Sequence, residues 1–131
     1  MKEVRGRILF LDDDADTCEV ISALFDQSGY ETITASTVRE GLKLVEDESF
    51  DLVLLDWKLE DGTGIEVCQK IRTFDVDTPV FFCTGVGEDS KIREAVEAGA
   101  QGYFIKPVDF DSLLETISVQ TGTPSCCGKQ G

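Results

Sequence analysis

Short hydrophobic runs alternate with helical patterns along the chain. The first run, residues 7–11, ends abruptly at the acidic triplet Asp12-Asp13-Asp14. Residues 51–56 enclose four consecutive aliphatic residues, which is typical of a parallel strand buried on both faces. Shorter or weaker runs predict three more strands, at residues 31–35, 79–84 and 103–105.

The segments after these runs have hydrophobic residues at the three- and four-residue spacing of a helix. The first helix is expected from Asp16 to Ser28, with Gly29 as its C-terminal cap. Thr37 followed by Glu40 is a capping box that opens the second helix. The residues expected to face inward from the second to the fifth helix are Val38, Leu42 and Val45; Ile65, Cys68 and Ile71; Ile92, Ala95 and Val96; and Phe110, Leu113, Leu114 and Ile117.

Strands that are separated by a single helix must run parallel, because the crossover returns the chain to the same edge of the sheet. The alternation therefore predicts an α/β fold, a doubly wound (βα)5 three-layer sandwich with the flavodoxin-like strand order 2-1-3-4-5. The 131 residues suit one domain. We assign it to residues 7–120, with residues 1–6 as an N-terminal arm and residues 121–131 as a flexible tail or truncated linker.

The composition excludes several classes of function. The 26 acidic and 12 basic residues give a net charge of −14, which argues against direct binding to nucleic acid or to a membrane surface. The chain has no histidine, so imidazole catalysis and histidine-ligated zinc are excluded. No apolar run approaches the ~20 residues of a membrane helix, and no secretion leader is recognisable. Cys18, Cys68 and Cys83 fit small core residues, and the sequence predicts a cytoplasmic protein.

Five polar residues lie where predicted strands end. Asp12 and Asp13 follow the first strand, Asp56 ends the third, Thr84 the fourth, and Lys106 follows the fifth. Because parallel strands end at the same edge of a sheet, these side chains should gather at one site. Three neighbouring carboxylates call for a cation, and an oxygen-only site suits Mg²⁺ or Mn²⁺. With the hydroxyl and the ammonium group, the set is suited to phosphoryl transfer onto a carboxylate.

The segments around these residues resemble the receiver domain of two-component response regulators. The resemblance extends from Arg7 to about Val119. It rests on Phe10-Leu-Asp-Asp-Asp14, Leu54-Leu-Asp-Trp-Lys58 with Gly64 eight residues after Asp56, Phe82-Cys-Thr-Gly85, and Gly102-Tyr-Phe-Ile-Lys-Pro107.

The resemblance implies a phosphorelay protein in which Asp56 accepts a phosphoryl group from a sensor histidine kinase or a histidine phosphotransfer protein. Lys106 and Thr84 would contact that group, and the domain would catalyse only its own phosphorylation and dephosphorylation. The Lys106–Pro107 bond is expected to be cis. The implied Mg²⁺ ligands are Asp12, Asp13, Asp56 and the backbone carbonyl of Lys58.

The resemblance also implies a conformational switch. Tyr103 would move inward with Thr84, and the surface of the last two helices would change toward a downstream effector protein or domain. The domain would act as a monomer or as a phosphorylation-dependent dimer. Glu60 stands where the family often has proline, and Gly85 where it usually has alanine. Neither departure falls on one of the five polar residues at the strand ends. Trp57 is expected to be a half-exposed residue beside the site.

Two other functions are compatible with parts of this pattern. A small phosphatase of the haloacid dehalogenase type would use Asp12 as its nucleophile, but its motif requires Thr or Val where Asp16 stands, and Asp56 would have no role. An interaction module of the same fold would never be phosphorylated. Asp14 and Asp16 have a simpler interpretation, as acids that cap and complement the first helix.

Overall fold

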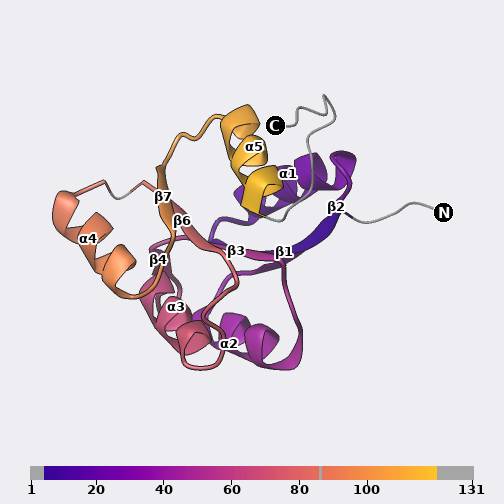
Figure 1. Cartoon of the computed structure of the whole chain (residues 1–131). Coiled ribbons are helices and arrows are strands. Elements are labelled where there is room, and N and C mark those ends of the chain that lie inside the picture. The colour runs from indigo at the N-terminus through magenta and orange to yellow at the C-terminus, as the bar shows by residue number, and fades with distance from the viewer. Residues whose placement is uncertain (1–4, 86, 121–131) are drawn as a thin grey trace.

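A five-stranded sheet forms the middle of the molecule in the computed structural model, which describes residues 5–85 and 87–120 (Figure 1). The strands are parallel and follow the order β2-β1-β3-β6-β7. Because β6 and β7 are the fourth and fifth strands of this sheet along the chain, the predicted order 2-1-3-4-5 is confirmed. Their bounds are β1 Gly6–Leu11, β2 Tyr30–Ala35, β3 Leu52–Leu55, β6 Val80–Thr84 and β7 Gly102–Ile105. A separate antiparallel hairpin consists of β4 Lys58–Leu59 and β5 Gly62–Thr63.

Helices cover both faces of this sheet, which confirms the predicted three layers (Figure 1). One layer is α1 Ala15–Gln27 with α5 Phe110–Gln120, and the other is α2 Val38–Asp47, α3 Gly64–Arg72 and α4 Asp89–Glu97. Successive strand residues point to opposite faces, so β1 sends Ile8 and Phe10 into the α1–α5 core and Leu9 and Leu11 into the α2–α3–α4 core.

The helix boundaries follow from the capping residues that the sequence predicts. Asp14 is the N-cap of α1, and its carboxylate accepts hydrogen bonds from Asp16 N at 3.3 Å and Thr17 Oγ1 at 2.6 Å. Thr37 caps α2 through a 3.0 Å bond from Glu40 N. In return, the Glu40 carboxylate accepts a hydrogen bond from the backbone N–H of Ser36, the residue before Thr37. After α1 the chain turns at Gly29, which has a φ of 95° that a residue with a Cβ rarely adopts.

Two predicted environments are wrong. Trp57 is buried, with 8% of its surface exposed, because its ring packs against Phe82 with 5.6 Å between the ring centroids. Val96 is 57% exposed although it was expected to face inward, because Ala95 is the buried residue of α4 and this short helix presents only a narrow face to the core.

Two smaller differences concern the segment after β3 and one of the cysteines. The chain after Asp56, where the sequence predicts no strand, forms a two-stranded hairpin in which Lys58 pairs with Thr63. Cys18 is only partly buried, whereas Cys68 and Cys83 are buried free thiols as predicted. Within the described part of the chain, no helix has the length and apolar character that a membrane span requires. The predicted tail, residues 121–131, lies outside the described residues.

Candidate functional site

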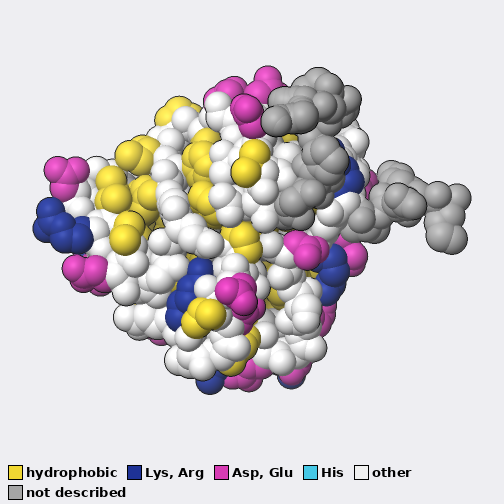
Figure 2. All heavy atoms as spheres, viewed as in Figure 1, with side chains coloured by type: hydrophobic (Ala, Val, Ile, Leu, Met, Phe, Trp, Pro, Cys, Tyr) yellow, Lys and Arg dark blue, Asp and Glu magenta, His cyan; other side chains and the backbone are white. Residues whose placement is uncertain are grey.

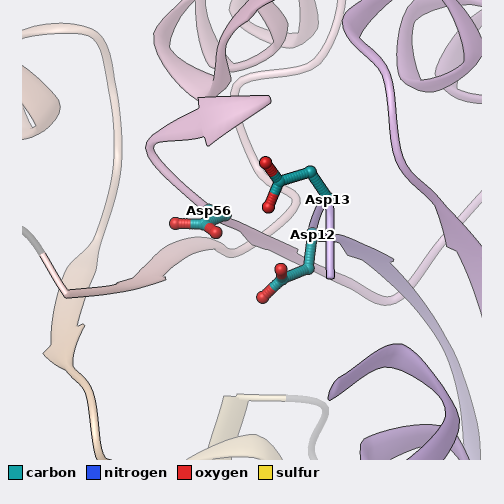
Figure 3. A group of neighbouring side chains, drawn as sticks. All are labelled: Asp12, Asp13 and Asp56. Carbon is teal, nitrogen blue, oxygen red and sulfur yellow. The ribbon is translucent and has the colours of Figure 1, made fainter. Parts of the chain in front are cut away.

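Three carboxylates meet at the carboxyl ends of β1 and β3 (Figure 3). Each of Asp12, Asp13 and Asp56 offers a carboxylate oxygen within 4.8 Å of those of the other two. Asp12 is 1% exposed and Asp56 is 9% exposed, whereas Asp13 faces solvent. The site is therefore buried on one side and open on the other.

Backbone hydrogen bonds that continue the sheet hold two of these acids in place. Asp12 N donates to Ala35 O at 3.1 Å, and Asp56 N donates to Leu11 O at 2.8 Å. Both bonds lie one residue beyond the ends of the strands. The parallel register thus sets how far apart the two acids stand.

Lys106 brings a positive charge to this cluster from the end of β7. Its backbone N donates to Thr84 O at 2.9 Å, and the Lys106–Pro107 bond is cis, as expected. Its ammonium nitrogen lies 2.6 Å from Asp12 Oδ2 and 3.5 Å from Asp56 Oδ2. One cation therefore bridges two of the three acids.

The Asp56 carboxylate accepts further hydrogen bonds, from Trp57 N to Oδ1 at 2.7 Å and from the buried hydroxyl of Thr84. Burial raises the pKa of Asp56, and the charge of Asp12 acts in the same direction. The bond from Thr84 and the charge of Lys106 reduce this rise without cancelling it.

Burial by itself would lower the pKa of Lys106, but its hydrogen bond to Asp12 and the charges of Asp56 and Asp12 outweigh burial and raise it. Lys106 is therefore a stable ammonium group at neutral pH. The structure thus brings together the five side chains that the sequence places at strand ends, namely Asp12, Asp13, Asp56, Thr84 and Lys106.

A row of aromatic rings leads away from the acids. Trp57 packs on Phe82, and Phe82 stacks on Tyr103 with centroids 5.9 Å apart and an interplanar angle of 17°. Phe104 turns to the opposite face of the sheet and packs on Phe81, as expected for adjacent strand residues. Tyr103 is half-buried, and burial together with the charges of Asp56 and Glu88 raises the pKa of its phenol.

Some neighbouring residues have other roles. Asp14 turns to the helix that it caps, as the sequence predicts. Lys58 lies in β4 with an exposed side chain. A Cβ on Gly64 would overlap the backbone oxygen of Asp56, so this glycine allows α3 to approach the site.

The donor set fits a divalent metal ion. All three acidic side chains offer oxygen, and among the ion pairs of the described residues only Lys106 places a cation against them. Mg²⁺ and Mn²⁺ prefer such oxygen ligands, and Mg²⁺ keeps several waters when proteins supply few carboxylates. The residues that could hold the ion are Asp12, Asp13 and Asp56.

Comparison with known proteins gives a consistent result. Residues 8–118 match the family model of the response regulator receiver domain. The chain is 38% identical over 111 residues to the transcriptional regulatory protein ZraR of Klebsiella oxytoca, covering 85% of this chain and 25% of ZraR. It therefore spans about a quarter of the length of that relative.

A shorter relative is covered almost completely. Sporulation initiation phosphotransferase F of Bacillus subtilis is 33% identical over 111 residues, which make up 85% of this chain and 90% of that protein. Among solved structures, a CheY-like response regulator receiver domain protein from Methanospirillum hungatei superposes with a TM-score of 0.85 at 32% identity. That superposition covers 93% of this chain and 95% of the other.

Proposed function

This chain belongs to the response regulator receiver domain family of two-component signalling, and from that premise we propose that its Asp56 is the residue that becomes phosphorylated. The observation that supports this assignment is the surroundings of the Asp56 carboxylate. It lies within 4.8 Å of two other acids, 3.5 Å from the Lys106 ammonium group and within a hydrogen bond of Thr84. Among the described residues, Asp56 is the one carboxylate of the cluster that has both a hydroxyl and an ammonium partner.

In the proposed reaction, an Asp56 carboxylate oxygen attacks the phosphorus of a phosphohistidine. A phosphorus–oxygen bond forms, the phosphorus–nitrogen bond breaks, and the imidazole of the donor leaves. The chain has no histidine, so the donor is a partner, a sensor histidine kinase or a histidine phosphotransfer protein. The catalysis is confined to the domain's own phosphorylation and dephosphorylation.

Residues of this chain balance the charge that the reaction brings in. A phosphoryl group on Asp56 carries a charge of roughly −1.5 to −2. It replaces the single charge of the Asp56 carboxylate and lies beside the two other acids of the cluster. Lys106 lies within reach of Asp56 and can pair with the new oxygens, and Thr84 can donate its hydroxyl to one of them. Mg²⁺ held by Asp12, Asp13, Asp56 and the Lys58 carbonyl would neutralise the remaining phosphoryl charge.

The signal would leave the site through β6 and β7. Drawing Thr84 toward the phosphoryl group would free space for Tyr103, whose ring stacks on Phe82 two residues before Thr84. Hydrophobic side chains gather on the face of the molecule over β7, α4 and α5 (Figure 2). Val96 of α4 is 57% exposed and Ile105 of β7 is 48% exposed.

This face would bind a downstream effector protein or domain, or a second phosphorylated copy, since exposed apolar surface favours association. The acidic chain would do so in the cytoplasm, without contacting nucleic acid or membrane itself.

The phosphatase alternative has less support. Asp12 would be its nucleophile, but Asp12 is 1% exposed, and its Oδ2 lies 2.6 Å from the Lys106 ammonium nitrogen, closer than the 3.5 Å to Asp56 Oδ2. Asp56 has the larger exposed fraction. An incoming phosphorus atom would therefore reach Asp56 first.

The test is phosphorylation by acetyl phosphate in the presence of Mg²⁺, followed by intact mass and by Trp57 fluorescence. We expect one phosphoryl group on the wild type, none on Asp56→Asn, and none after chelation of the metal. Asp14→Asn is the matched control, because it removes an adjacent acid that caps α1 and faces away from the cluster. It should accept the group normally.

The remaining outcomes separate the alternatives. A label that survives Asp56→Asn but disappears in Asp12→Asn would favour the phosphatase. Absence of label in every variant, with the fold intact by circular dichroism, would favour a module that acts by binding alone.

A further inference from the structure

Strand β2 forms one end of the sheet, opposite to β7 and α4 (Figure 1). Among the described residues it pairs with β1 only, through six consecutive residue pairs from Gly6–Tyr30 to Leu11–Ala35. Every second residue of such an edge strand turns its N–H and C=O groups away from the sheet. Unpaired backbone groups of this kind form a template for a further strand.

This edge has few of the features that usually block strand addition. Such features include proline, charged side chains and lysine above all, a bulge or a very short edge strand. The six residues Tyr-Glu-Thr-Ile-Thr-Ala of β2 contain no proline and no lysine, and their register with β1 is unbroken. Their one charged residue, Glu31, pairs with Arg7 of β1 at 3.3 Å. At the other edge, β7 has four residues and is followed directly by Lys106-Pro107.

A groove of about 910 Å³ runs along this edge between β2 and α1. Small α1 residues, among them Ala15, Ser22 and Ala23, line it and leave the space open. Seven of the lining residues are Asp or Glu, and none of the described residues that line it is Lys or Arg. Glu19 and Asp26 lie seven residues apart on α1, and both line the groove. Neither carboxylate forms a side-chain hydrogen bond or an ion pair with a described residue.

A buried polar atom of a residue that lines the groove also lacks a partner among the described residues. Thr32, in the middle of β2, lines the groove, and its Oγ1 is buried without a hydrogen bond to any described residue. Buried hydroxyl groups nearly always have a partner in a folded protein. A strand laid along β2 would bring amide and carbonyl groups to this side of the sheet.

We propose that the free edge of β2 is a docking site for an extended segment of a partner protein that is rich in lysine or arginine. The segment would extend the sheet by one strand beside β2, with main-chain hydrogen bonds supplying affinity and the carboxylates of the groove selecting a cationic sequence. At about 3.3 Å per residue, five or six residues would match the length of β2. Asp12 and Asp13 line one end of the groove, so the docking site adjoins the phosphorylation site and shares these two acids with it, whereas Glu19 and Asp26 belong to the groove alone.

A second copy of this chain is a poorer occupant of the same edge. Pairing two β2 strands would bring two acidic grooves together, each belonging to a chain with a net charge of −14. Like charges facing each other across an interface disfavour association.

The probe is a synthetic peptide, Lys-Val-Lys-Thr-Lys-Val with blocked ends, titrated into the full chain and followed by amide resonances and calorimetry. We expect resonance shifts centred on residues 30–35. A fully N-methylated peptide of the same sequence and charge cannot donate main-chain hydrogen bonds, and it should bind at least about tenfold more weakly.

Variants test the electrostatic part. Glu19→Gln with Asp26→Asn should weaken peptide binding by about threefold to tenfold, as the loss of two exposed charge pairs implies. Glu94→Gln with Glu97→Gln is the matched control, because it removes two exposed charges from one face of α4 at the other end of the sheet, and it should bind as the wild type does.

Several results would overturn the docking site. These are equal binding of the N-methylated peptide, equal loss in both double variants, shifts that map outside β2 and α1, or self-association of the chain through β2. Both double variants should still accept a phosphoryl group from acetyl phosphate. If that reaction failed, the proposed role of Asp56 would be contradicted. The docking proposal would still be tested by the peptide titration alone.

Discussion

The ammonium nitrogen of Lys91 lies 5.2 Å from the centre of the Trp57 ring. This contact links α4 to the residue that follows Asp56 in the chain, because Trp57 also donates its backbone N–H to the Asp56 carboxylate. The indole also packs against Phe82 on β6. Trp57 thus contacts both a cation of α4 and the aromatic row that ends at Tyr103.

Replacing Lys91 should weaken this connection. Lys91→Gln is expected to lower the free energy of unfolding by about 0.5–1 kcal/mol, the usual contribution of a partly exposed cation over an aromatic ring. It should also change the emission of Trp57. Urea unfolding followed by fluorescence measures both effects. Arg93→Gln on the same helix is the control, and equal losses in the two variants would contradict a specific contact.

Neutralising Asp13 should have opposite effects with and without metal. In the metal-free protein, Asp13→Asn relieves repulsion from Asp12 and Asp56 and is expected to raise the free energy of unfolding by roughly 1 kcal/mol. Added Mg²⁺ should raise the melting temperature of the wild type, because it binds the folded state only. Most of that increment should be absent in the variant.

Thermal unfolding with Mg²⁺ and with a chelator measures both effects, and Glu115→Gln on α5 controls for the change in net charge. A variant that is destabilised without metal, or that keeps the full increment with Mg²⁺, would contradict a metal site at these acids.

A methyl group at residue 64 should disturb the site, whereas one at residue 85 should not. Gly64→Ala places a Cβ against the Asp56 carbonyl and the Phe82 ring, and overpacking of this kind costs about 1–3 kcal/mol. A Cβ at Gly85 meets nothing within 4 Å, so Gly85→Ala should be neutral or stabilise by about 0.4–1 kcal/mol. Chemical unfolding and the acetyl phosphate reaction measure the two variants; similar behaviour of both would refute the proposed close approach at Gly64.

Asp61 should make stability depend on pH. Its carboxylate accepts from Val38 N at 2.6 Å and Arg39 N at 3.2 Å, and the bond from Val38 is the main reason that the pKa of Asp61 is lowered. A lowered pKa in the folded state gives stability that is complete above about pH 4 and is lost as the pH falls through the folded value.

Asp61→Asn should therefore be less stable than the wild type at neutral pH, with the gap closing in acid. Unfolding measured across this pH range tests the prediction, with Glu60→Gln as the neighbouring control. A gap that stays constant with pH would show that the charge of Asp61 contributes nothing to the cap of α2.

Local features of the sequence predicted most of the fold. The side chains of Asp14 and Thr37 begin helices because they accept hydrogen bonds from backbone N–H groups two or three residues later. Gly29 follows the end of α1 because a residue without a Cβ readily adopts its positive φ. Predictions about exposure were weaker. Trp57 and Val96 were each placed in the wrong environment, because burial depends on residues that are distant in the sequence, such as Phe82 for Trp57.

Residues that act across the fold were also missed. Nothing near Asp61 indicates that it bonds to the first residues of α2, which begins twenty-three residues earlier at Val38. The contact exists only once the hairpin β4–β5 lies against that helix. The contact of Lys91 with Trp57 is of the same kind.

The sequence by itself determined which polar residues this protein places at the ends of its strands, and which strand each of them follows. It could do so because hydrophobic periodicity and strand ends are properties of neighbouring residues. Tertiary structure decided the distances, such as 2.6 Å from Lys106 to Asp12 and 3.5 Å to Asp56. It also decided that β2, which pairs only with β1 within the described part of the chain, lies beside an acidic groove. Those quantities depend on how strands far apart in the chain pair and twist, and on which side chains of other elements fill the space around them.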